Sequence, residues 1–324
     1  MNFTVRQFDQ TMTEGERSIL ITVNIFIALV GIPGNLFILV FFIRSEKYRE
    51  SSYRYFLLHL AVSDLLTCCL IPLTKIPVLF TRGRWTTGHF SCQFLYPLTW
   101  MSVANSAWIL CGLCWDRYKS ISKPLDGRLT KKQITIYCVV GWVVSFTIYG
   151  PFYFITRVED GFCDRFFFGE ERSYTTYIDL AKDIFKGYLP SSTMITFLIN
   201  MQMSLKQRRK ELSGRLRVDK DHRVFQRMQK NSKFVTLTTV LFVGCLLPST
   251  MLNTTVNILR YVPRYEHDLV LYERFDRVLG WLWGLTYVNS AINCFIYAGS
   301  FKDFQQFIVV SLKGFFYCHL FTKR

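Results

Sequence analysis

Seven stretches of the chain are apolar over about the length that crosses a bilayer, and polar or charged segments separate them. A helix needs roughly 20 mostly apolar residues to cross the hydrocarbon core. The stretches that meet this length cover residues 19–43, 55–80, 94–115, 133–155, 183–203, 234–258 and 278–298. The pattern predicts an all-α membrane protein, a bundle of seven transmembrane helices.

A shorter apolar repeat follows the seventh stretch. Phe301, Phe304, Phe307 and Ile308 recur at helical spacing, which predicts a short amphipathic helix lying on the membrane surface. The chain therefore divides into an outer segment (1–18), a seven-helix domain (19–298) and an inner tail with the amphipathic helix (299–324).

Charge predicts the orientation of the bundle. If residues 1–18 lie outside, the inner side carries 25 Lys and Arg against 8 Asp and Glu, and the outer side carries 14 against 14. Lys and Arg collect on the cytoplasmic side of membrane proteins, so we expect the amino end outside and the carboxyl end inside. The net charge of +16 then reflects topology and attraction to anionic membrane lipid, not nucleic-acid binding. The densest basic segment, 206–233, is expected to extend the fifth and sixth helices into the cytoplasm.

Two charged sites interrupt the apolar stretches. Asp64 lies inside the second stretch, and Asp116-Arg117-Tyr118 ends the third. Charges at membrane depth are costly and are usually kept for function. A carboxylate such as Asp64 must find a cation, a proton or hydrogen-bond donors.

Cysteines and sequons suggest modifications. Seven of the ten cysteines lie in apolar stretches and suit packing: Cys68, Cys69, Cys111, Cys114, Cys138, Cys245 and Cys294. Cys92 and Cys163 fall on predicted outer segments, where oxidation is allowed, so we expect a disulfide between them. Cys318 is either a site for a reversible acyl chain or a free thiol. Asn2 begins an N-x-T glycosylation sequon on the predicted outer side.

Several short motifs fall one per span and in order. They are Gly34-Asn35, the run 60–64 (LAVSD), Cys92 followed by Asp116-Arg117-Tyr118, Trp142 with Pro151, Pro190, Phe242 with the run 245–248 (CLLP), and the run 289–297 (NSAINCFIY). Over nearly its whole length the chain thus resembles the rhodopsin-like (class A) G-protein-coupled receptors. The run 289–293 looks most like neuropeptide receptors.

The resemblance implies a plasma-membrane receptor that binds an extracellular ligand and activates a heterotrimeric G protein. It implies that Arg117 is held by Asp116 at rest and released toward the G protein on activation, with Tyr118 and Tyr297 lining the opening. Further switch positions would be Asn293, Phe242 and Pro248. It also implies an allosteric sodium ion held by residues with short oxygen-bearing side chains: Asp64, Ser106, Asn289, Ser290 and Asn293. A hydrated polar cluster without an ion is the alternative.

The resemblance also bears on the class of ligand. Thr99 stands where aminergic receptors carry an Asp, and Tyr287 where opsins carry the retinal Lys, which argues against an amine and against retinal. Because the run 289–293 resembles that of neuropeptide receptors, we expect a small peptide. It would be bound by an aromatic, hydrogen-bonding pocket of Thr99, Trp100, Val103, Asn253, Asn257, Arg260, Trp283 and Tyr287. The loop 156–176, with its Phe166-Phe167-Phe168 run, is expected to form a hairpin lid.

Four departures from the family pattern leave alternatives open. Leu246, Cys294, Leu198 and Ala107 replace residues that the family uses in activation, which puts the standard route in doubt. A non-signalling scavenger receptor is one alternative. A transporter is another, although such proteins usually have several charged residues near the membrane midplane, and here only Asp64 is expected there. No HExxH or GxSxG motif indicates an enzyme.

Overall fold

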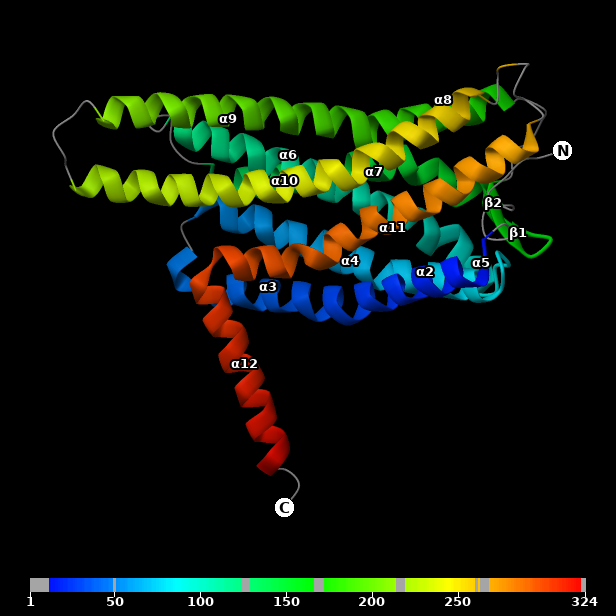
Figure 1. Cartoon of the computed structure of the whole chain (residues 1–324), viewed down its shortest axis with the longest axis horizontal. Helices are drawn as coiled ribbons and strands as arrows, with labels where there is room; N and C mark the ends of the chain where they lie inside the picture. The colour runs from blue at the N-terminus through cyan, green and yellow to red at the C-terminus, as the bar shows by residue number, and fades with distance from the viewer. Residues whose placement is uncertain are drawn as a thin grey trace.

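The computed structural model describes residues 12–48, 51–123, 129–165, 172–213, 219–259, 262 and 268–321. Seven long helical rods lie side by side in these residues, as predicted (Figure 1). In chain order they are α2 (Glu14–Phe26) joined through a π-helical turn (Ile27–Gly31) to α3 (Ile32–Arg44), α4 (Ser52–Phe80), α5 (Gly88–Phe90) joined through Ser91–Leu95 to α6 (Tyr96–Ser122), α7 (Lys131–Ile155), α8 (Arg172–Asp183) joined through Ile184–Tyr188 to α9 (Leu189–Ser213), α10 (Asp219–Leu259) and α11 (Leu269–Ser300).

Three smaller elements complete the described fold. A 3-10 turn, Glu46–Tyr48, follows α3, and the strands β1 (Thr156–Glu159) and β2 (Phe162–Arg165) form an antiparallel hairpin. The last helix, α12 (Lys302–Phe321), turns away from the bundle at the end opposite the hairpin and the amino terminus (Figure 1).

The helices extend past the predicted apolar spans. The first begins at Glu14 rather than residue 19, because Thr13 and Glu16 form a reciprocal capping box. The fifth rod begins at Arg172 rather than residue 183, and α11 begins at Leu269 rather than residue 278. The apolar pattern identifies only the part of a helix that contacts lipid. The polar ends of a longer helix are therefore not predicted from it. The last helix, α12, also runs on to Phe321, beyond the predicted 301–308.

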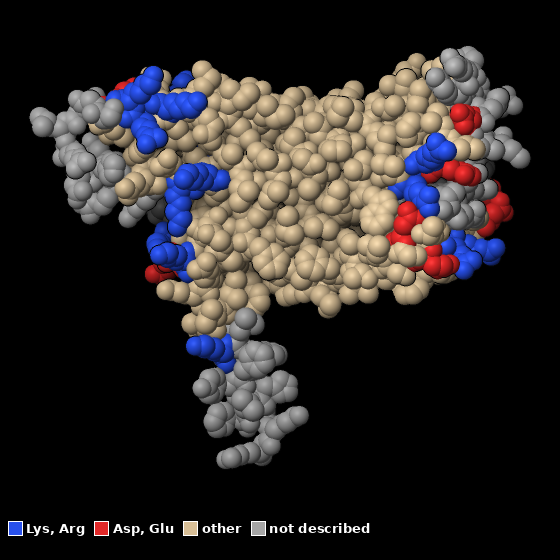
Figure 2. All heavy atoms as spheres, viewed as in Figure 1, with Lys and Arg blue, Asp and Glu red and all other residues tan. Residues whose placement is uncertain are grey.

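Five described rods are long and apolar enough by themselves to cross a membrane: Glu14–Arg44, Ser52–Phe80, Gly88–Ser122, Lys131–Ile155 and Met228–Leu259. The two other rods, α9 and α11, pack against α6 and α10 respectively. Figure 2 shows charged side chains gathered at the two ends of the bundle, with an uncharged belt between them. Large apolar side chains such as Leu29, Val143 and Phe146 are exposed, as lipid-facing residues are.

Close packing between the first and seventh rods positions the central polar residues. A Cβ added at Gly34 would lie 2.8 Å from both Cβ and Sγ of Cys294, so only glycine allows this approach. Next to it, Asn35 Nδ2 donates to the Ser290 carbonyl at 3.0 Å and to the Gly31 carbonyl at 2.9 Å. The Gly34-Asn35 motif thus sets α3 directly against α11.

Candidate functional site

Asp64 is at the centre of a buried polar cluster formed by three helices. It lies on α4 with 1% of its surface exposed. Ser106 Oγ of α6 donates to Asp64 Oδ1 at 3.0 Å, and Asn293 Nδ2 of α11 donates to Oδ2 at 2.6 Å. Ser290 of α11 is also buried and interacts with the same carboxylate. Four of the five predicted ion-site residues therefore meet.

The donor set of this cluster suits a hard cation. Asn293, whose Nδ2 donates to Asp64, has a buried Oδ1 with no hydrogen-bond partner among the described residues. Asn289, the fifth predicted residue, also has a buried and unpartnered Oδ1, but it makes no hydrogen bond to Asp64 in the described part of the chain. Buried polar atoms are normally paired, and oxygen atoms are the ligands that hard cations prefer. The described residues hold no group of three or more His, Cys, Asp or Glu that could bind a metal. With a single carboxylate, the cluster fits a monovalent ion better than a divalent one.

A second polar chain links α4 and α6 beside Asp64, and sequence reasoning missed it. Ser63 Oγ donates to the Ser102 carbonyl at 2.9 Å, Thr67 and Ser102 share a hydrogen bond of 2.8 Å, and Asn105 Nδ2 donates to Ser63 Oγ at 3.3 Å. All four side chains are buried. The sequence contained a signal for this chain of polar residues. Ser63 and Thr67 are four residues apart, and Ser102 and Asn105 are three apart, so each pair lies on one face of its helix.

Arg117 lies at the end of the bundle nearest α12, which we call the inner end because the sequence predicts it to be cytoplasmic. Arg117 is held there by its neighbour and by α4. Its Nε donates to Asp116 Oδ2 at 3.0 Å, and its Nη2 donates to the same oxygen and, at 3.3 Å, to Ser52 Oγ. The guanidinium lies 5.2 Å from the centre of the Tyr53 ring. The side chains of Arg117 and Asp116 are 11% and 2% exposed, so this ion pair is largely withdrawn from water.

A group of aromatic rings surrounds that ion pair. Tyr53 packs 6.4 Å from Phe234 of α10 and 5.9 Å from Phe301, and Phe234 lies 5.1 Å from Tyr297, measured between ring centres. We call Tyr53, Phe234, Tyr297 and Phe301 the inner aromatic cluster. Tyr297, a predicted switch residue, is 1% exposed, and its hydroxyl has no partner among the described residues.

The start of α12 is fixed to the loop after α3. Lys47 Nζ lies 2.6 Å from Asp303 Oδ2, and the Tyr48 hydroxyl donates to the same oxygen at 2.8 Å. These two hydrogen bonds lower the pKa of the Asp303 carboxyl, whereas burial first, and then the bond to Asp303, raise the pKa of Tyr48. The amphipathic helix is thus tied to the inner end of the bundle.

The other switch positions lie in the bundle core or face its surface. The ring of Tyr118 packs against that of Phe197, with 5.9 Å between the ring centres, and Phe242 is buried in the main core. Pro248 lies inside α10, whose helix continues through it, and its side chain is exposed.

The four departures from the family pattern fit the same packing. Leu246 and Ala107 are buried in that core. Leu198 packs against it and α11 continues through Cys294, so these positions take part in packing without breaking a helix.

In the half of the bundle nearest the hairpin, which we call the outer half because the sequence predicts it to be extracellular, three predicted ligand residues form one aromatic group. The Trp100 ring of α6 lies 5.5 Å from Trp283 and 5.7 Å from Tyr287, both on α11. Tyr96 is 6.4 Å from Trp100. We call Tyr96, Trp100, Trp283 and Tyr287 the outer aromatic cluster.

The remaining predicted ligand residues have separate roles. Val103 is a core residue, and Thr99 is buried with its hydroxyl bonded to the Leu95 carbonyl of its own helix. Asn253 donates to Asp183 at 2.8 Å, whereas Asn257 is buried with an unpartnered Nδ2 among the described residues.

Outer charges were the main omission of the sequence analysis. Asp183 is 2% exposed, accepts hydrogen bonds from Asn253 and Thr254, and lies 3.6 Å from Lys186 Nζ. Lys186 in turn lies 4.8 Å from the centre of the Trp100 ring. Lys75, inside α4, lies over two other rings of the outer aromatic cluster. The sequence did contain a signal for Lys75 and Lys186, because both charged residues fall inside predicted apolar spans.

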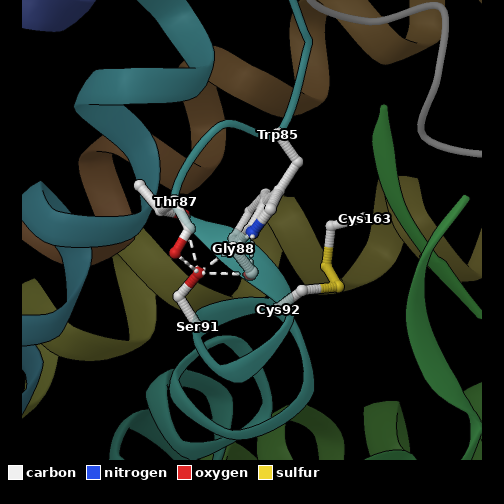
Figure 3. Close-up of a disulfide and its surroundings, with 6 residues drawn as sticks. All are labelled: Trp85, Thr87, Gly88, Ser91, Cys92 and Cys163. Atoms are coloured by element: carbon white, nitrogen blue, oxygen red, sulfur yellow. Dashed lines mark hydrogen bonds between the residues drawn. A yellow bond between two sulfur atoms is a disulfide. The ribbon is translucent and has the colours of Figure 1, made fainter. Parts of the chain in front are cut away.

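A disulfide holds the hairpin over the outer end. Cys163 of β2 is joined to Cys92 at the start of the third rod (Figure 3). Trp85 adds a second attachment, because its backbone N donates to the Gly161 carbonyl at 2.7 Å and its Nε1 to Ser91 Oγ at 3.0 Å. The hairpin turn uses Asp160 and Gly161, both at positive φ, as tight hairpin turns require. The loop therefore contains the expected hairpin.

Some predictions lie outside the described residues. These concern Asn2, Arg260 and the Phe166-Phe167-Phe168 run, and the side chain of Cys318.

Comparison with known proteins identifies the family. Residues 34–297 match the family described as 7 transmembrane receptor (rhodopsin family). The chain is 29% identical over 198 residues to muscarinic acetylcholine receptor M3 of Rattus norvegicus, covering 58% of this chain and 32% of that receptor. It is 23% identical over 292 residues to the C3a anaphylatoxin chemotactic receptor of Danio rerio, covering 89% of this chain and 73% of that receptor. The chain thus spans about a third of the length of the muscarinic receptors that it matches.

The family match agrees with the seven-helix bundle. The matched family is one of receptors rather than of transporters or enzymes. The chain belongs to the rhodopsin family of seven-transmembrane receptors.

Proposed function

We propose that this receptor binds a small extracellular peptide and activates a heterotrimeric G protein on the cytoplasmic side of the plasma membrane. The amino-terminal segment and the hairpin lie outside in this proposal, and α12 lies inside. The excess of Lys and Arg in the inner loops and tail supports this orientation. Asn2 would then be available for glycosylation, and Cys318 for acylation, at opposite membrane faces.

The observation that carries the coupling proposal is the arrangement around Arg117. A guanidinium that is 11% exposed is bonded to Asp116 and Ser52 and covered by the Tyr53 ring. In this packing it is unavailable to a partner at the inner end. A ligand that binds more tightly to a second helix packing shifts the population toward it, and release of Arg117 in that packing would expose a cationic contact for the G protein.

Replacement of Arg117 by Ala tests this proposal. Cells expressing the parent or the variant are exposed to a panel of free and amidated peptides, and several G-protein sensors report activation. We expect loss of every response in Arg117→Ala with unchanged surface delivery, measured through an extracellular epitope tag. Activation by the variant equal to that of the parent would contradict the proposed role.

We also propose a sodium ion at Asp64. The support is one buried carboxylate together with the unpartnered amide oxygen of Asn293, whose amide nitrogen donates to that carboxylate. The purified receptor should unfold at a higher temperature in sodium chloride than in N-methylglucamine chloride of equal ionic strength. Asp64→Asn should remove the difference, and a sodium effect that persists in this variant would rule out the ion site.

A peptide ligand is supported by the chemistry of the outer end. The outer aromatic cluster and the buried Asp183 and Lys186 offer both apolar and charged contacts. One relative, the C3a anaphylatoxin chemotactic receptor, is named for an anaphylatoxin. Another, the muscarinic receptor, is named for acetylcholine, so the peptide panel should include small amines as the contrasting class.

A scavenger receptor without G-protein signalling is the second candidate. It is favoured by Leu246, Cys294, Leu198 and Ala107, the four altered switch positions. Uptake of a panel peptide by internalisation, without activation of any G-protein sensor, would support this candidate and contradict the first.

A further inference from the structure

Lys75 lies half-buried in α4, over two rings of the outer aromatic cluster. Its Nζ is 5.4 Å from the centre of the Tyr96 ring and 5.5 Å from that of Trp283. An ammonium group has three N–H donors. Within the described part of the chain, none of the three meets a hydrogen-bond acceptor, and no carboxylate lies at ion-pair distance.

The two other lysines of the outer half are arranged differently. Lys182 pairs with Asp179 and Lys186 with Asp183, each with the acid three residues earlier on the same helix. The residue three before Lys75 is Pro72, so its own helix offers no such partner. Contact with aromatic faces attracts the ammonium group of Lys75, but it satisfies none of its N–H donors.

A second donor of the same cluster is also unpaired. Tyr287 is 3% exposed, and its hydroxyl has no hydrogen-bond partner among the described residues. Its ring contacts Trp100, which contacts Trp283, one of the two rings under Lys75. The cluster thus combines a cation and a phenol, both lacking acceptors, with a wall of indole rings.

We propose that this cluster is the subsite for a ligand carboxylate attached to an aromatic or apolar group. Lys75 binds the carboxylate through a charge-assisted hydrogen bond, Tyr287 donates a second hydrogen bond, and the apolar group of the ligand packs on Trp100 and Trp283. This inference rests on the proposed receptor function. It narrows the ligand to a peptide with a free carboxyl end, in preference to its amide.

The test uses two probes that differ only in the carboxylate. The thermal unfolding midpoint of the purified full-length chain is titrated with N-acetyl-L-tryptophan and, separately, with N-acetyl-L-tryptophanamide. We expect the acid to stabilise the receptor at lower concentration than the amide. Loss of a hydrogen bond to a charged group corresponds to about 10- to 100-fold in affinity, so Lys75→Gln should weaken acid binding by that factor and leave amide binding unchanged.

A matched control comes from the inner end. Lys131 is an exposed lysine whose Nζ lies 5.6 Å from the centre of the Tyr55 ring, so Lys131→Gln also removes a lysine that contacts an aromatic ring. It should keep the preference for the acid, as should Lys75→Arg, which retains the charge.

Three results would overturn the proposal: equal effects of acid and amide on the parent, an acid preference that survives Lys75→Gln, or stronger stabilisation by phenyl phosphate than by the acid. The comparison of acid and amide on the parent protein needs no variant to fold. Because the readout is binding alone, a receptor that prefers the acid but fails to activate G proteins contradicts only the coupling proposal. A receptor that activates G proteins without the acid preference contradicts only the carboxylate subsite.

Discussion

Replacing Asp116 by Asn should increase ligand-independent signalling, and the structure gives the size of the effect. Asn keeps the shape and one acceptor oxygen but removes the charge that faces Arg117. The Asn amide oxygen can still accept a hydrogen bond from the charged guanidinium, so the change removes the attraction between opposite charges and not the hydrogen bond. Exposed ion pairs contribute about 0.2–1 kcal/mol, and removing one partner of a buried pair costs about 3–5 kcal/mol. The pair is largely buried, with side chains 11% and 2% exposed, and Asn keeps part of the interaction, so we expect an intermediate loss of about 1–1.5 kcal/mol.

That difference acts on the equilibrium between packings. If Arg117 leaves Asp116 on activation, the resting packing alone is destabilised. At about 1.4 kcal/mol for each factor of ten, the active population should rise about 5- to 12-fold. The assay is the initial rate of nucleotide exchange on purified G proteins, one from each Gα class, with receptor in lipid nanodiscs and no ligand.

The matched control is Asp303→Asn. This change also converts an acid to an amide at the inner end, but Asp303 contacts Lys47 and Tyr48 rather than Arg117, so its exchange rate should equal that of the parent. An unchanged or lower rate for Asp116→Asn, with normal amounts of folded receptor, would refute the idea that this ion pair stabilises the resting state.

Three further predictions concern stability. Gly34→Ala should lower the unfolding midpoint, with a loss of about 1–3 kcal/mol from overpacking, whereas Gly244→Ala, where an added Cβ meets nothing within 4 Å, should not lower it. Cys92→Ser opens a loop with a sequence separation of 71 and should cost about 4 kcal/mol; a midpoint equal to that of the parent would exclude a structural role. Asp303 has a lowered pKa because its carboxylate accepts hydrogen bonds from Lys47 and Tyr48. Its contribution should therefore be fully present above about pH 4 and lost as the pH falls through the lowered pKa, so the midpoint difference between the parent and Asp303→Asn should shrink on acidification.

The sequence predicted the bundle because crossing a membrane is a local requirement. Each span must by itself remain apolar over the hydrocarbon thickness, and that property can be counted along the chain. The same contrast made Asp64 and Arg117 visible as charges next to apolar residues. Helix ends were missed, as at Arg172 and Leu269, because outside lipid a helix needs no apolar pattern to continue.

Only the tertiary structure decided which polar side chains meet. Arg117 is covered by Ser52 and Tyr53 of α4, and Asp183 pairs with Asn253 of α10, residues distant in sequence. Lys75 is an ordinary interruption of an apolar span until packing brings Tyr96 and Trp283 beneath it. Such contacts depend on how far each helix is rotated about its axis, and the interlocking of side chains from several helices sets that rotation. No single helix carries this information in its own pattern of apolar positions.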